Sequence, residues 1–163
     1  MIKMSYKQLI EELKKNPGIA EQKMKVKLTK EGAFKVNVKV GRHKLIFDEE
    51  KVIGGTNEGP APAQMLLASI GGCMLSTMQV WSHLLDIKFS SAEISIKGTI
   101  NLFGMLGIDD NISAGFQKIT VDIKIESDES EERVQQLVEA VEKHCPVVNT
   151  VMNATKVKTK IKS

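Results

Sequence analysis

The sequence predicts an α+β fold in which antiparallel sheets pack against a long central helix. Strand-like segments come in groups before residue 48 and between residues 92 and 125, and helical segments interrupt the groups. Between the groups, the stretch 58–80 (EGPAPAQMLLASIGGCMLSTMQV) would be apolar on nearly every side of a helix. The 163 residues suffice for one domain with a real core, so we expect a helical appendage over 1–18 and a single domain over 19–163.

The first predicted element is a short amphipathic helix, capped by Ser5 and stopped by the Asn16-Pro17-Gly18 sequence. After it, apolar residues alternate with lysines, which is the period of half-exposed strands. The connection 29–32 suits a hairpin. We therefore expect an antiparallel meander with strands over residues 24–28, 34–40 and 43–47.

The central helix is predicted to begin near Pro62, where a proline loses nothing by lacking an N–H group, and to end near Asp86. Gly54-Gly55 gives the preceding loop its backbone freedom. Inside the helix stand Gly71 and Gly72, each costing about 1 kcal/mol relative to alanine, so another element should press closely against that turn. A helix that is apolar on every side should be buried on every side, which a homodimer sharing two such helices would achieve.

The rest of the chain is predicted to hold strands over 92–101 and 116–125, with a partly apolar, glycine-containing loop over 102–114 between them. Ser127 or Asp128 is expected to cap an amphipathic helix that ends at 143–146. A last strand is expected over 155–161, where Val157, Thr159 and Ile161 alternate with lysines.

Composition excludes several classes of function. The net charge is only +3, and the lysines have no interleaved aromatic residues, so we expect no nucleic-acid partner. The central helix is too interrupted by glycine and polar residues to suit a membrane span. Residues 1–15 are charged and contain no apolar signal core, and the chain has two cysteines, so we expect a reducing cytoplasm.

The two cysteines, Cys73 and Cys145, are the candidate reactive groups. In a reducing compartment such a pair is more often catalytic or redox-active than structural, although two inert core cysteines fit the residue types equally well. Pro146 suits the start of a helical turn reaching about residue 153, which would make Cys145 an N-cap, where aligned N–H groups favour a thiolate. Cys73 lies in an apolar stretch and therefore needs a specific partner in order to react.

We expect no metal and no other cofactor. A zinc site made from Cys73, His144 and Cys145 would need adjacent histidine and cysteine side chains to act as two ligands of one tetrahedral ion. That spacing does not match a closed zinc site.

The segments around the two cysteines, GGTNEGPAPAQMLLASIGGC and HCPVVNT, resemble the OsmC/Ohr superfamily, the osmotically inducible and organic-hydroperoxide-resistance proteins. The resemblance covers about residues 24–163. It implies an intertwined homodimer with two long central helices, flanked by antiparallel sheets, and an active site at the subunit interface. It further implies a thiol peroxidase for apolar organic hydroperoxides, with Cys73 peroxidatic, Cys145 resolving, and a small dithiol or a dithiol protein as reductant.

The sequence departs from the family pattern near the first cysteine. Peroxidases of this family pair a Glu next to the motif proline with an Arg, whereas Ala63 and Gln64 follow Pro62 here. The candidate supporting residues are Arg42, Glu58 and Gln64. Without a cation near Cys73 we expect peroxidase activity to be weaker or absent. The alternatives are an OsmC-like protein that binds an apolar small molecule at its dimer interface and a protein for dithiol–disulfide exchange.

Overall fold

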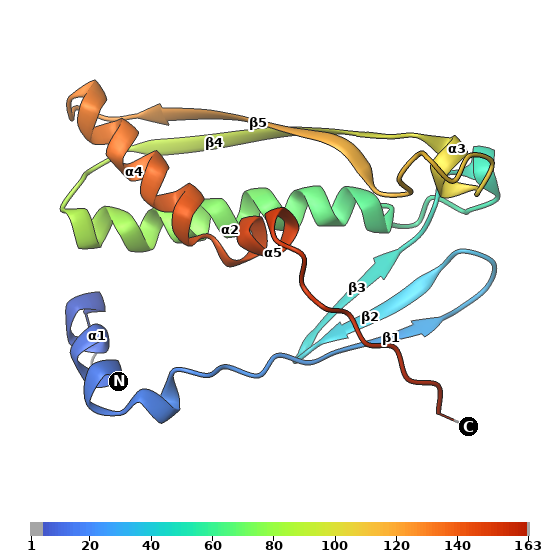
Figure 1. Cartoon of the computed structure of the whole chain (residues 1–163), viewed down its shortest axis with the longest axis horizontal. Helices are drawn as coiled ribbons and strands as arrows, with labels where there is room; N and C mark the ends of the chain where they lie inside the picture. Colours follow the sequence, from blue (N-terminus) through green and yellow to red (C-terminus); the bar gives the residue numbers. More distant parts are fainter. Residues whose placement is uncertain (1–4, 163) are drawn as a thin grey trace. The chain divides into compact units, whose positions relative to one another are not determined.

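The computed structural model describes residues 5–162, and the chain divides into two compact units that meet in sequence between Leu66 and Leu67. The fold is mixed α+β, with one antiparallel sheet of three strands and one of two (Figure 1). The three-stranded sheet belongs to the first unit and the two-stranded sheet to the second. The predicted fold class is therefore confirmed.

The first unit opens with helix α1 (Tyr6–Lys15), followed by the 3₁₀ turn η1 (Pro17–Ile19). Ser5 caps α1 as predicted. Its hydroxyl accepts the N–H of Gln8 (3.3 Å), and the Gln8 side chain accepts the N–H of Ser5 (2.9 Å). This reciprocal capping box satisfies two backbone donors that a helix start leaves free.

The three-stranded sheet consists of β1 (Val26–Lys30), β2 (Val36–Val40) and β3 (His43–Phe47). Its register places Leu28, Val38 and Leu45 side by side on one face, with Val38 only 5% exposed. The first hairpin connection lies at residues 31–35, later in the chain than the predicted 29–32. Strand β1 continues to Lys30, and the N–H of Glu31 donates to the carbonyl of Lys35 (2.7 Å) to close the turn.

The loop after β3 contains the 3₁₀ turn η2 (Lys51–Ile53) and needs both of its glycines. Gly54 has φ +99°, a left-handed conformation that side chains disfavour. A Cβ on Gly55 would lie 1.9 Å from the carbonyl oxygen of Glu49. The predicted use of the Gly54-Gly55 pair is confirmed.

Helix α2 (Pro62–Leu85) begins at the predicted proline and continues through the unit beginning at Leu67. There the long hairpin of β4 (Ser91–Ile100) and β5 (Phe116–Glu126) runs along it (Figure 1). A Cβ on Gly71 would lie 3.2 Å from the side chain of Ile96, whereas one on Gly72 would meet nothing within 4 Å. The expected close approach therefore exists and involves the first glycine of the pair.

Three more helices complete the second unit: α3 (Leu102–Met105), α4 (Glu131–His144) and α5 (Pro146–Met152). The core lies where α2, the inward face of the β4–β5 hairpin and α4 meet. Its buried members are Ile70, Met74, Met78, Ile87, Leu137, Val141 and Cys145.

The end of α2 is held by Arg133, a residue that the sequence analysis did not single out. Asp86 has φ +53°, and the N–H of Ile87 donates back to the carbonyl of Ser82 (2.9 Å), as in a Schellman cap. Arg133 of α4 donates to the carbonyls of Leu85 (3.2 Å) and Asp86 (2.7 Å). This arginine therefore fastens the start of α4 to the end of α2.

In the single chain α2 buries one stripe and leaves Leu75 36% exposed, so its burial on every side, which the expected homodimer would complete, stays a prediction. Two other predictions about the elements are wrong. The cap of α4 is Ser130, because Ser127 instead bonds the Lys88 carbonyl and the N–H of Glu129. Residues 155–161 form no strand within the described chain, where Ile161 is 97% exposed. Alternation alone does not make a strand without a neighbour for the backbone to bond.

Helix α2 is also, within residues 5–162, the one helix long and apolar enough to cross a membrane by length and composition. The core helix of a soluble protein passes the same test.

Candidate active site

Cys73 lies on α2 and is half-buried. Thr77 and Trp81 follow it at intervals of four residues, which places all three on one side of the helix. Thr77 is 8% exposed, so its hydroxyl must find a partner inside the protein.

Cys145 lies in the corner between α4 and α5 and is completely buried. Its N–H donates to the carbonyl of Val141 (2.9 Å), and its carbonyl accepts the N–H of Asn149 (3.0 Å). The Asn149 side chain also donates to the carbonyls of Lys143 (3.1 Å) and Cys145 (3.0 Å). The amide group thus ties the last turn of α4 to the first turn of α5 and fixes the backbone of Cys145.

The two thiols meet. The Cys73 thiol lies in hydrogen-bonding range of the sulfur of Cys145, the hydroxyl of Thr77 and the N–H of Val147. Pro146 has no N–H, so Val147 is the first residue of α5 that can offer one. Both cysteines are free thiols, and both contact the apolar core cluster.

The surroundings of Cys73 favour the neutral thiol. Burial, the largest effect, raises its pKa, and the neighbouring Cys145 raises it further. The Val147 N–H and the Thr77 hydroxyl act in the opposite direction, because both donate to the thiolate. None of these groups is a cation.

A second contact joins the same two elements. The rings of Trp81 on α2 and His144 at the end of α4 are stacked, with centroids 4.4 Å apart and planes inclined by 18°. The sequence analysis missed this pair together with Thr77, Val147 and Asn149. Thr77 could have been found, since a hydroxyl four residues after a helical cysteine lies beside it. The others depend on how α4 and α5 pack.

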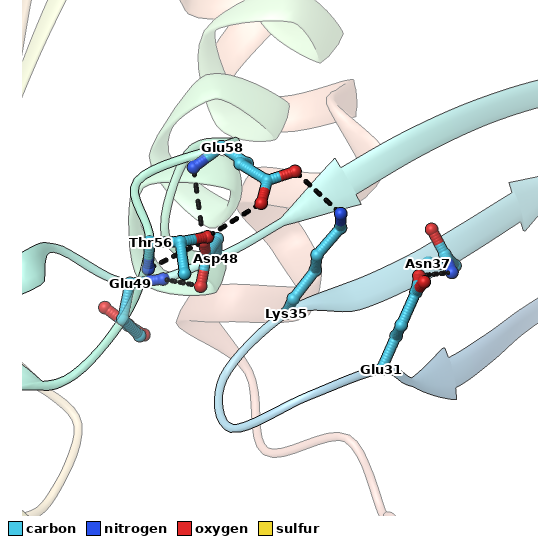
Figure 2. A network of polar contacts seen from close by, with 7 residues as sticks. All are labelled: Glu31, Lys35, Asn37, Asp48, Glu49, Thr56 and Glu58. Carbon is cyan, nitrogen blue, oxygen red and sulfur yellow. Dashed lines mark hydrogen bonds and ion pairs between the residues drawn. The ribbon is translucent and has the colours of Figure 1, made fainter.

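The three candidate supporting residues belong to the first unit and the two cysteines to the second. Arg42 is exposed in the turn between β2 and β3. Gln64 accepts the N–H of Ala61 (3.0 Å) at the start of α2. Glu58 accepts a hydrogen bond from Lys35 (2.6 Å), which lowers the pKa of Glu58 and raises that of Lys35 (Figure 2). Their part in the chemistry of Cys73 stays a prediction.

Asp48, at the centre of the network in Figure 2, is 1% exposed and organises the loop leading into α2. Its carboxylate accepts the backbone N–H groups of Glu49 (2.8 Å), Thr56 (3.0 Å) and Glu58 (3.2 Å), as well as the Thr56 hydroxyl. These bonds, the hydroxyl first, lower its pKa to about 2. Among the described residues, no group of three or more His, Cys, Asp or Glu side chains could hold a metal ion.

The chain thus has an α+β fold with two free thiols packed at the same apolar core. The family model of the OsmC-like protein matches residues 55–160, and the chain belongs to this family. Proteins of the family are soluble, which agrees with α2 as a core helix. A comparison with curated protein sequences gives no significant match.

Solved structures share the fold at low sequence identity. An OsmC-like protein from Mycoplasma pneumoniae is 19% identical, with a TM-score of 0.72 over 82% of this chain and 90% of its own. An organic hydroperoxide resistance protein OsmC from Legionella pneumophila, also described as a predicted redox protein, is 16% identical. Its TM-score is 0.62 over 81% of this chain and 90% of its own. A putative organic hydroperoxide resistance protein from Vibrio cholerae, with captopril in one of its active sites, is 16% identical. Its TM-score is 0.57 over 83% of this chain and 89% of its own.

Proposed function

We propose that this protein is a two-cysteine thiol peroxidase that reduces apolar organic hydroperoxides. The observation that carries the proposal is the contact between the thiols of Cys73 and Cys145, which are far apart in the sequence, at the edge of an apolar core. The family agrees with it, because relatives of the same fold are named hydroperoxide resistance proteins.

The reaction divides into three balanced steps. The sulfur of Cys73 attacks the O–O bond of the hydroperoxide ROOH, becoming a sulfenic acid and releasing the alcohol ROH. The thiol of Cys145 then condenses with the sulfenic acid, forming a disulfide and releasing water. A dithiol reductant exchanges with the disulfide, becomes oxidised, and returns both cysteines to thiols.

The exposure of the two thiols supports the assignment of roles. Cys73 is partly exposed, whereas Cys145 is completely buried, so a peroxide can approach the first sulfur more readily than the second. The pKa of Cys73 is raised, and the reactive thiolate is therefore a minor species at neutral pH. We expect a slow enzyme whose rate of peroxide reduction rises with pH through the alkaline range.

A homodimer is part of the proposal. The described chain leaves a cluster of apolar side chains exposed on and after α3, and a contiguous patch of this kind marks an interaction site more often than a free surface. In a dimer this cluster would be covered or would line a site for apolar peroxides. Its members are Leu102, Phe103, Met105, Leu106 and Ile108, each more than half exposed.

The N-terminal helix offers a test of the proposed dimer. We expect a chain that starts at Met24 to elute as a dimer from a sizing column, because α1 buries no residue of its own and contributes nothing to the apolar cluster. A truncated chain that elutes as a monomer would contradict this division of the molecule.

The peroxidase proposal is tested with cumene hydroperoxide and the reduced protein. The wild type should consume one equivalent of peroxide and lose two thiols, and it should turn over when dithiothreitol is supplied. Cys145→Ser should stop at a sulfenic acid that dimedone traps, while Cys73→Ser should not react. If both wild-type thiols persist in excess peroxide, the protein is not a peroxidase.

Dithiol–disulfide exchange is a second candidate. The thiols lie beside each other, so the pair could reduce a disulfide of another protein, becoming a disulfide itself as the other protein's cysteines become thiols, without any peroxide. The Legionella pneumophila relative is described as a predicted regulator of sulfide bond formation, which favours this candidate. Cys145→Ser should then trap mixed disulfides through Cys73, and the wild type should reduce a protein disulfide faster than it consumes cumene hydroperoxide.

A further inference from the structure

We propose that the stack of Trp81 on His144 is a positioning device that holds Cys145 within bonding reach of Cys73. It rests on the proposed function in one respect, since it concerns how readily the thiol pair closes to a disulfide. The partners of the Cys73 sulfur are Cys145, Thr77 and Val147. The two rings therefore act through the backbone of the corner between α4 and α5.

The two elements that carry the cysteines are joined at two neighbouring points. Cys73 touches Cys145, and Trp81, two turns further along α2, touches His144, the residue directly before Cys145. Fixing the ring of His144 against α2 therefore fixes the position of the next residue along the chain. A disulfide forms only when the Cα atoms come within about 7 Å, so this placement matters for bond formation.

The corner also packs on α2 through the apolar core, where Val141 and Cys145 are completely buried. Cys145 has extended backbone (φ −72°, ψ 116°) between two helices, and its own polar groups bond to Val141 and Asn149. Arg133 fastens α4 to α2 at the opposite end of the helix. The ring stack adds a directional side-chain contact to this apolar packing at the end that bears Cys145.

The ring of His144 lies against α2 although the residue is at the surface. His144 is an exposed residue that could extend into solvent, yet its ring lies flat on the half-buried indole. Aromatic pairs of this geometry shift equilibria by about threefold to tenfold beyond what buried area supplies. Because the stack is already formed in the free-thiol protein, this range is the upper limit of its effect on the disulfide equilibrium, reached when loss of the stack lets the corner move away from Cys73.

The test measures the thiol–disulfide equilibrium constant of the pair in glutathione buffers, in which the oxidised protein forms as glutathione disulfide becomes two glutathione thiols. We expect Trp81→Leu and His144→Ala each to lower the constant for disulfide formation by about threefold to tenfold. A tenfold change corresponds to about 30 mV. Trp81→Phe keeps a stacking ring and should stay within about twofold of the wild type.

Two controls separate positioning from a general loss of packing. The equilibrium constant of the double variant should be no lower than that of either single variant, because both substitutions remove the same contact. Val134→Ala shortens a half-buried side chain nearer the start of α4 and should leave the equilibrium constant unchanged. The proposal is overturned if the single variants match the wild type, if their effects multiply, or if Val134→Ala has the same effect.

Binding of phenylarsine oxide, which bridges two thiols with loss of water and without any oxidation, gives an independent measurement on the same variants. The affinity should follow the same order. A wild type that forms no disulfide in any glutathione buffer but binds the arsenical would count against the peroxidase while leaving the stack testable. A wild type that binds no arsenical would overturn the positioning role itself.

Discussion

The pKa of a buried ionisable group moves in opposite directions in the loop before α2, at Asp48, and on α2 itself, at Cys73. Asp48 receives three backbone N–H groups and a hydroxyl, and its pKa falls to about 2. Cys73 receives one N–H and one hydroxyl and faces a second thiol, and its pKa is raised. Burial opposes the charged form in both places, so the hydrogen bonds that each group receives decide the direction in which its pKa moves from the ordinary value.

This comparison explains how the protein can have a reactive pair without a strongly acidic thiol. The chain can stabilise an anion inside the protein, and it does so at the loop that leads into the helix. At the sulfur it provides half as many donors, which do not offset burial and the neighbouring thiol, so the pKa of Cys73 stays above its ordinary value.

The largest effect is expected from removing the carboxylate. Asp48→Ala leaves the N–H groups of Glu49, Thr56 and Glu58 without their acceptor, and we expect the melting temperature to fall by about 5–10 °C. Calorimetry measures it. Glu50→Ala, at an exposed neighbouring position, is the matched control and should change the melting temperature by less than about 2 °C. Equal values for the two variants would show that the donors are satisfied without Asp48.

Acid should reveal the same group in the wild type. The pKa of Asp48 is about 2 in the folded protein, below its ordinary value of 3.8, so its contribution to stability is complete above that ordinary value. The contribution is lost as the pH falls through 2. Melting temperatures measured from pH 5 to pH 1.5 should fall more steeply for the wild type than for Asp48→Asn. Parallel curves would contradict the low pKa.

A smaller effect is expected at the thiol. Thr77→Val removes one of the two donors to Cys73 without changing the shape of the side chain, so the pKa of Cys73 should rise further. The rate of alkylation by iodoacetamide at pH 8 should fall by about threefold to tenfold. Thr77→Ser restores a hydroxyl and should recover most of the rate. A valine variant that reacts as fast as the wild type would mean that Val147 alone stabilises the thiolate.

The smallest effect is expected from the ion pair at the edge of the loop network. The side chains of Lys35 and Glu58 are 25% and 49% exposed, so water screens their attraction. Lys35→Met should raise the pKa of Glu58, which NMR titration measures, while the melting temperature changes by less than about 3 °C. A larger loss of stability would place this pair with Asp48 among the groups that hold the loop.

Much of the fold could be predicted from local patterns. Ser5, Pro62 and Pro146 mark helix starts in the positions where their chemistry is useful, and all three predictions are confirmed. The hairpin strands β4 and β5 alternate apolar and polar residues because one face packs on α2. The failures have a physical reason as well. Ser127 and Ser130 are both good caps, but the Ser127 hydroxyl donates to the distant Lys88 carbonyl, whereas the Ser130 hydroxyl accepts the N–H of Arg133.

The two cysteines of the candidate site could be predicted, whereas most of the residues around them and the geometry of the site could not. Two cysteines and their flanking motifs can be read in the chain, whereas the contact between them depends on the angle between α2 and the corner after α4. The same holds for the ring stack, because neither Trp81 nor His144 has a periodic pattern that points to the other. Interactions between distant segments are set by tertiary packing, which single-residue preferences do not encode.

The arginine that closes the end of α2 has a consequence for the order in which the nascent chain matures. The carbonyls of Leu85 and Asp86 receive their donor from Arg133, which the ribosome adds only after the entire β4–β5 hairpin has been synthesised. Until then the helix that carries Cys73 has an open C-terminal end and no α4 to cover its apolar stripe. This helix therefore emerges early in translation but reaches its final form late, and a chaperone would have that interval in which to bind it.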